Sequence, residues 1–164
     1  MRKIVTLFIL FSSIIAFGQS KTESENWIVE KHSEYKNSYN PNMDLWFENG
    51  YMYYYWTVDD KREPAKRIAS IFRIKIKDIK SIKTTIKKLD DVSISKFVLY
   101  CAKGKLESKS LPENSNFVDT GEDFLDIDLN ENFKKDGINI RMEKAFLHLI
   151  KLYGGTATVK KEAF

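Results

Sequence analysis

The sequence has very little cysteine and histidine, which limits the chemistry it can carry. Among its 164 residues there are one cysteine, Cys101, and two histidines, His32 and His148. A single cysteine excludes an internal disulfide, and its place in the apolar run at 97–102 predicts a buried, unreactive thiol. There is no Gly-x-Ser-x-Gly motif; His148 falls on the polar side of a predicted helix and His32 is solitary, so we interpret neither as catalytic. The sequence therefore predicts no catalytic residue.

Long apolar runs are also absent, except for one of fourteen residues at 4–17. Two basic residues precede this run, and it is followed by Gly18 and Gln19. The order of positive, apolar and small residues predicts a signal peptide over 1–18, cleaved between Gly18 and Gln19. The run is shorter than the ~20 residues that span a bilayer, so a retained membrane anchor is the less favoured alternative. We expect an exported protein, periplasmic or extracellular, with no transmembrane segment in the mature chain.

The charge of the chain is close to balanced. The formal net charge of +4 falls to +2 over 146 residues when the leader and its two basic residues are removed. This balance argues against a global nucleic-acid or membrane-surface binder. A chain of this length usually folds as one domain, and we find no internal repeat or linker. We therefore predict a single α+β domain over 19–155, followed by a polar C-terminal tail over 156–164.

The strongest local signal is a β-hairpin. Asn49-Gly50 supplies the two positive φ angles of a tight turn, and the flanking segments 45–48 and 51–58 are rich in aromatic and β-branched residues. Alternation of apolar and polar side chains predicts further antiparallel strands. These strands are expected at 67–77, 82–87, 93–102, 106–109 and 124–129.

Two helices are expected, one near each end of the mature chain. The segment 22–25 has the Ser/Thr-x-x-Glu spacing of a capping box and predicts a helix over 23–36. A second, amphipathic helix is predicted over 139–153, because apolar residues recur there at helical spacing. Its apolar face would carry Met142, Phe146, Leu149 and Tyr153, and its solvent face Arg141, Lys144, His148 and Lys151.

Together these elements predict an α+β fold: a mostly antiparallel sheet rolled into a small barrel, with the N-terminal and C-terminal helices packed on it. The segments Glu25-Asn26-Trp27-Ile28, 76–82 and 142–152 resemble those of a group of small uncharacterised exported bacterial proteins. The order of strands with a final helix is also similar to a pleckstrin-homology-like barrel. The resemblance implies a fold and carries no activity, because its motifs are packing motifs.

One short pattern is similar to a calcium-binding loop. Asp126, Asp128 and Asn130 alternate as the first three oxygen ligands of such a loop do. The sixth position, which needs glycine, is Glu131, and the twelfth, which needs glutamate, is Gly137. Only half of the pattern is present, so we expect neither a metal ion nor a cofactor.

Charge is distributed unevenly along the chain. Residues 66–88 contain nine basic side chains and one acidic one, whereas residues 107–136 contain nine acidic and three basic ones. The basic segment could hold an anionic ligand such as a lipid headgroup or an acidic glycan. Alternatively, basic and acidic strands lie side by side and their charges pair across the sheet. The near cancellation of the two segments favours pairing.

The predicted hairpin contains seven aromatic residues between positions 46 and 56. Alternating side chains cannot all face one core, so one face must be covered by the N-terminal helix, be covered by a partner, or remain as a platform on which sugar rings stack. Together with the basic strand that follows, the hairpin suggests a ligand surface. The candidate residues are Trp46, Tyr54, Trp56, Arg73, Lys75 and Lys77.

These observations favour a secreted or periplasmic, non-catalytic binding module. The partners considered are a glycan, an anionic lipid or a protein, and not a nucleic acid, because no aromatics interleave the lysine run. Two alternatives stay open. One is a small carbohydrate- or lipid-active hydrolase that uses the acidic residues of 119–128. The other is a structural accessory subunit that docks through the hairpin 45–58.

Overall fold

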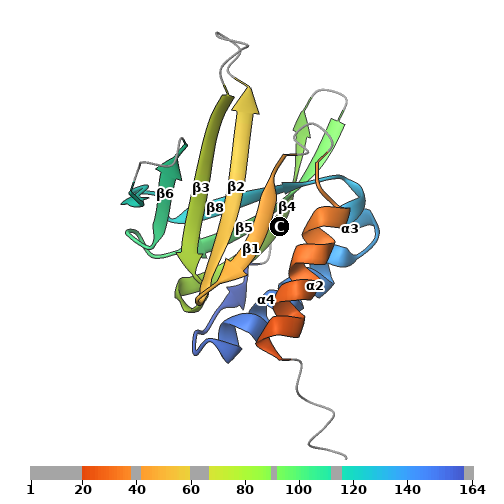
Figure 1. The fold of residues 1–164 in the computed structure, drawn as a ribbon. Coiled ribbons are helices and arrows are strands. Elements are labelled where there is room, and N and C mark those ends of the chain that lie inside the picture. The colour runs from red at the N-terminus through yellow and green to blue at the C-terminus, as the bar shows by residue number, and fades with distance from the viewer. Residues whose placement is uncertain (1–19, 38–41, 60–66, 90–91, 112–115, 161–164) are drawn as a thin grey trace, which may run out of the picture.

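The computed structural model describes residues 20–37, 42–59, 67–89, 92–111 and 116–160. Over these residues the chain forms two sheets, with two long helices lying side by side against them (Figure 1). The predicted signal peptide at 1–18 lies outside the described residues. The prediction of an α+β fold with mostly antiparallel sheets is confirmed.

The first sheet contains the predicted hairpin, and the turn is formed as expected. Asn49 and Gly50 have φ angles of 50° and 79°, the positive values that this turn requires. All neighbouring strands in this sheet are antiparallel. In spatial order they are β1 (Asp44–Glu48), β2 (Tyr51–Asp59), β3 (Arg67–Lys75), β6 (Leu106–Ser110) and β7 (Val118–Asp119).

A short 3₁₀ turn, η1 (Ile76–Asp78), carries the chain from the first sheet into the second. The second sheet has four strands, of which the last pairs in parallel with its neighbour. Their spatial order is β8 (Phe124–Leu129), β5 (Val92–Cys101), β4 (Ile79–Leu89) and β9 (Thr158–Val159).

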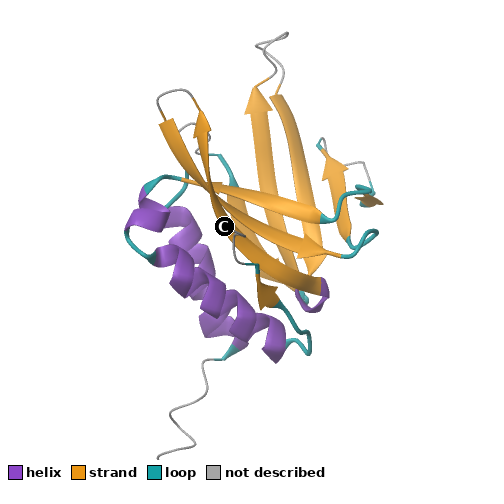
Figure 2. Cartoon of the chain, turned by 180° about the vertical axis from the view of Figure 1, so that it is seen from behind, coloured by secondary structure: helices purple, strands orange, loops and turns teal. Residues whose placement is uncertain are grey.

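The predicted barrel is wrong, because neither sheet closes on itself. After η1 the chain starts a new sheet with β4, and it returns to the first sheet only when β6 pairs with β3. The strands are therefore divided between two open sheets (Figure 2). Side chains from both sheets and from the helices fill the space between them, so packing takes the place of barrel-closing hydrogen bonds.

The N-terminal helix is confirmed, but its start differs from the prediction. Helix α2 (Lys21–Glu34) begins after Ser20, whose hydroxyl accepts from the N–H of Glu23 at 3.2 Å. The Glu23 carboxylate in turn accepts from the N–H of Ser20 at 2.7 Å. The capping box therefore lies two residues before the one predicted at Thr22, because a second Ser-x-x-Glu pattern precedes it.

The C-terminal helix is confirmed as α4 (Ile138–Leu152), and a four-residue helix, α3 (Asn132–Lys135), precedes it. Met142, Phe146 and Leu149 are buried, as the helical spacing predicted. They join a core built from both sheets, in which the largest buried side chains include Tyr54, Phe97 and Phe133.

The predicted polar tail takes part in the second sheet. A Cβ atom on Gly155 would lie 2.7 Å from the carbonyl oxygen of Lys77, so only glycine allows the chain to pass η1 this closely. The chain then reaches β4 and pairs with it as β9. Sequence polarity did not indicate this strand, because two residues at a sheet edge need no apolar pattern.

Cys101 is buried at the end of β5, as predicted. Burial raises the pKa of its thiol to about 11, so the reactive thiolate is scarce at neutral pH. The thiol therefore fills core space.

Candidate functional site

The outer face of the first sheet carries a row of side chains that crosses all five strands. The strand register aligns Trp46, Tyr53, Arg73, Glu107 and Asp119. Because side chains two apart in a strand share a face, Tyr51 and Lys75 lie on this face as well. The register therefore gathers aromatic and charged groups that are far apart in the sequence.

The members of this outer face contact one another closely. The rings of Trp46 and Tyr53 stack at 5.2 Å with an interplanar angle of 7°. The Arg73 guanidinium lies 3.9 Å from the centre of the Phe117 ring and 5.0 Å from that of Tyr51. Its Nε donates to a carboxylate oxygen of Glu107 at 2.5 Å. The cation is thus already enclosed by two rings and one carboxylate.

Three of the six candidate ligand-surface residues, Trp46, Arg73 and Lys75, lie on this outer face. The ammonium of Lys75 lies 5.5 Å from the centre of the Tyr51 ring. Tyr51 and Tyr53, which the candidate set left out, stand beside them. The alternation along β2 puts Tyr51 and Tyr53 on one face and Tyr54 and Trp56 on the other. The candidate set included Tyr54 and Trp56, which lie on the inner face.

The other three candidates lie elsewhere. Tyr54 is 1 % exposed, and its hydroxyl donates to the Met43 sulfur at 2.7 Å, so it belongs to the core. Trp56 shares that inner face of β2 and packs partly buried against the core. Lys77 sits in η1, after the strand has ended. The structure therefore does not bring the six residues together, and Tyr54 is removed from the candidate surface.

The pairing interpretation is supported at Arg73 and Glu107, which join the basic segment 66–88 to the acidic segment 107–136. The acids of β8 pair instead with a lysine outside that basic segment. Lys96 on β5 contacts Asp126 at 2.5 Å and Asp128 at 3.4 Å, both on β8. Asp119 lies in the other sheet, on β7. The described part of the chain has no group of three or more potential metal-ligating side chains. The acids proposed for hydrolysis are therefore divided between two sheets.

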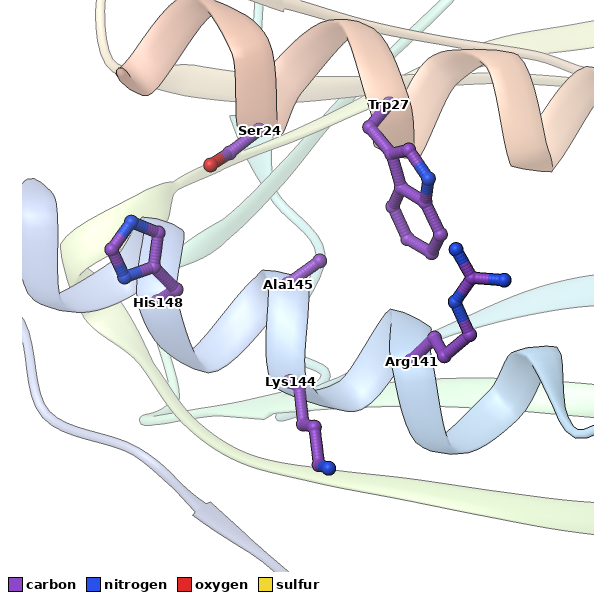
Figure 3. Close-up of a pocket in the computed structure, with 6 residues that line it drawn as sticks. All are labelled: Ser24, Trp27, Arg141, Lys144, Ala145 and His148. Carbon is purple, nitrogen blue, oxygen red and sulfur yellow. The ribbon is translucent and has the colours of Figure 1, made fainter. Parts of the chain in front are cut away.

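A groove between α2 and α4 is the feature that the sequence analysis missed (Figure 3). Its volume is about 350 Å³. The two helices are joined at one end of it, where the hydroxyl of Tyr153 donates to Glu25 at 2.7 Å. The lining residues are Ser24 and Trp27 from α2, and Arg141, Lys144, Ala145 and His148 from α4.

The charge of this lining is one-sided. It contains arginine, lysine and histidine, and none of the six described lining residues is acidic. The Arg141 guanidinium lies 5.4 Å from the centre of the Trp27 ring, and Figure 3 shows it beside the indole. In the same view Lys144 extends along the outer rim, away from α2. The positively charged guanidinium and the apolar indole thus lie side by side in the lining of the groove.

A buried hydroxyl lies at the base of the groove. Ser24 is 2 % exposed, and its Oγ has no hydrogen-bond partner among the described residues. In Figure 3 this oxygen points away from α2, towards the side on which α4 carries His148. An unpaired buried hydroxyl costs free energy, so a ligand or water that reached it would gain a hydrogen bond.

The sequence analysis assigned Arg141, Lys144 and His148 to a solvent face because they lie opposite the apolar face of α4. The structure places them at the groove because α2 packs beside that face. The signal that could have shown this was weak: Ser24, Ile28 and His32, four residues apart, are the buried side of α2. Nothing local specifies which helix or strand that side meets.

The other histidine is part of the core. His32 is 2 % exposed, and its ring lies 6.0 Å from that of Tyr54, edge to face. Burial lowers the pKa of His32 to about 4, with a further contribution from nearby Lys36. The ring is therefore neutral at pH 7 and serves packing.

Comparisons with protein-family models, with curated protein sequences and with solved structures find no match to this chain. The resemblance to exported bacterial proteins consequently stays a prediction. In the part of the chain that the structure describes, none of the helices combines the length and the apolar character needed to cross a membrane.

Proposed function

We propose that this chain is an exported binding module, and that the groove between α2 and α4 holds a small ligand with a carboxylate or phosphate group. The observation that carries the proposal is the combination of a one-sided positive lining with a buried, unpaired hydroxyl at Ser24. A concave site with a few convergent polar groups is the usual form of a small-ligand site.

Four of the lining residues would contact the ligand in this proposal. Arg141 offers a planar fork of donors that matches two oxygens of a carboxylate or phosphate. The hydroxyl of Ser24 donates a further hydrogen bond from the floor, and His148 lies on the wall of α4. The Trp27 indole provides a flat apolar surface, so a ligand that combines an aromatic ring with an anionic group fits best.

Ser24 and His148 also invite comparison with a nucleophile and its base. A nucleophilic serine needs a hydrogen bond to the group that takes its proton. The Oγ of Ser24 has no hydrogen-bond partner, so the two residues are not joined in this way. The described residues around them are basic rather than acidic. These features support binding over catalysis.

The proposal is tested by thermal-shift and calorimetric titration of the mature protein with phenyl phosphate, benzoate, inorganic phosphate and uncharged benzyl alcohol. Phenyl phosphate should bind most tightly, and raising the salt concentration should weaken it. The variant Arg141→Gln should lose about tenfold or more in affinity, because a charge-assisted hydrogen bond contributes ~1.5–3 kcal/mol.

The matched control is Lys151→Gln, which removes an exposed positive charge from the same helix outside the groove. This variant should bind phenyl phosphate as the unmodified protein does. Equal losses of affinity in both variants would show that only the net charge of the protein matters, and would contradict binding in the groove. Equal binding of benzyl alcohol would show that the anionic group is not recognised.

A further inference from the structure

Among the described strands β4 is the longest, and most of one edge has no described partner. On that side β9 pairs only with Ser81 and Ile82, and the N–H of Lys160 donates to the carbonyl of Ile82 at 2.7 Å. From Lys83 to Leu89 no described strand pairs with β4 on this side. Among the described residues, seven of β4 therefore have no strand paired on this edge.

The direction of the backbone groups along this edge follows from the pairing of Ile82. Successive residues of a strand direct their N–H and C=O groups to opposite sides. Because the carbonyl of Ile82 points towards β9, the backbone groups of Thr84, Ile86 and Lys88 point to the open edge. Three evenly spaced sets of donors and acceptors thus face outward, as in domains that bind a peptide as an added strand.

The side chains along the edge are basic. Lys87 and Lys88 are exposed and Lys83 is half-buried, and no ion pair with a described acidic residue neutralises any of them. Lysines on an edge strand discourage pairing with a second copy of the same edge, because like charges would then meet. The same charges favour a strand that carries acidic side chains.

A hollow of about 300 Å³ lies on the inner face of the β4–β5 pair, between β4, β5 and α3; its lining residues are Ile86, Ser93, Ser95, Glu131, Lys134 and Lys135. Ile86 lines it and is 49 % exposed, and on β5 the register partner of Ile86 is Ser95. Ser95 also lines the hollow, is fully buried, and has an Oγ without a described hydrogen-bond partner. The hollow could therefore receive one side chain of an added strand.

We propose that the edge of β4 over residues 83–88 binds an extended acidic segment of a partner protein. This segment would pair with β4 on the same side as β9, along the part of β4 that β9 does not reach. An apolar side chain of that segment packs on Ile86 at the hollow. The end of the β4–β5 pair projects past the helices (Figure 2), and the hollow at Ile86 is bounded by Lys134 and Lys135 of α3, whose positive charges also suit an acidic segment. This proposal is independent of the groove between α2 and α4.

The experiment uses a labelled peptide, Glu-Val-Asp-Ile-Asp-Val-Glu, and fluorescence anisotropy with the mature protein. The peptide should bind, and the double variant Lys87→Glu/Lys88→Glu should lose about tenfold or more in affinity. Lys103→Glu, an exposed charge in the turn after β5, should change affinity less than twofold. In amide hydrogen exchange, the peptide should slow exchange at Thr84, Ile86 and Lys88.

Three results would overturn the proposal. A peptide of the same charge with proline at alternate positions cannot donate to the edge, and equal binding of that peptide would exclude strand addition. Concentration-dependent self-association that the peptide blocks would identify a second copy as the occupant. Unchanged exchange at the three edge amides would place the peptide elsewhere. Arg141→Gln should bind the peptide normally, which separates this proposal from the groove.

Discussion

Two arginine side chains in this protein lie against aromatic rings, and their surroundings differ. On the outer face of the first sheet, Arg73 contacts Phe117 and Tyr51 and is bound by the Glu107 carboxylate. In the groove, Arg141 lies beside Trp27, and no carboxylate is among the described lining residues. A carboxylate therefore neutralises the arginine on the sheet, whereas no described lining residue neutralises the arginine in the groove.

The difference shows that residue type and local charge density do not identify a ligand site. The hairpin is the most aromatic part of the sequence and is followed by the basic segment 66–88, yet the register brings a carboxylate to Arg73 on their outer face. The groove has fewer aromatic and charged residues but lacks a counter-charge. Whether a cation is available to a ligand depends on which strand or helix lies next to it.

The largest expected effect is a difference in stability between substitutions on the two faces of β2. Tyr54→Ala removes a fully buried ring and should lower the free energy of unfolding by about 3–5 kcal/mol. Tyr53→Ala, one residue earlier on the outer face, loses a half-buried ring stacked on Trp46 and should cost about 1 kcal/mol. Urea denaturation of both variants measures the difference. Equal losses would show that the outer face is packed as tightly as the core.

The next largest effect is on the pH dependence of stability, to which His32 should contribute. The unfolded chain binds a proton at the ring of His32 near its ordinary pKa of 6.5, whereas the folded protein binds it only near pH 4. Stability should therefore be fully present above pH 6.5 and should fall by about 3 kcal/mol as the pH drops to 4.

Urea denaturation at several pH values checks this expectation, with His32→Phe and His148→Gln as the pair of variants. The phenylalanine variant should lose this part of the pH dependence, because the buried group no longer titrates. The His148→Gln variant should keep it, since His148 lies at the groove rather than in the core. A pH profile unchanged by His32→Phe would contradict the assignment.

The smallest effect tests the neutralised arginine directly. A double-mutant cycle with Arg73→Met and Glu107→Gln should give a coupling free energy of about 0.5–1 kcal/mol, because the two side chains are 26 % and 35 % exposed. Arg141→Met should change stability by less than about 0.5 kcal/mol, since its surface position has no ion-pair partner among the described residues. A coupling near zero would mean that the Arg73 pair contributes nothing beyond its contacts with the rings.

Much of the secondary structure was predictable because it depends on neighbouring residues. Asn49-Gly50 specified the hairpin turn, and β8 begins and ends where the alternation at 124–129 placed it. The buried face of α4 follows from its helical spacing. The strands β7 and β9 were missed, because two-residue strands carry no pattern that sequence reasoning can detect.

The candidate site was predicted only in part. Trp46, Arg73 and Lys75 were placed on one surface, but alternation alone could not say which face of β2 meets the core. In the structure Tyr54 faces the core, where its hydroxyl donates to the Met43 sulfur. The groove could not be predicted at all, since its two walls are separated by more than a hundred residues.

The sequence by itself determined the local conformations: where the hairpin turns, which residues alternate along a strand, and which side of α4 is apolar. These depend on backbone sterics and on side-chain periods that operate over a few residues. Only the tertiary structure decided that the strands form two open sheets, that Glu107 neutralises Arg73, and that Arg141 and His148 line a groove with Ser24. The physical reason is that pairing and desolvation depend on contacts between segments distant in the chain, which no local pattern specifies.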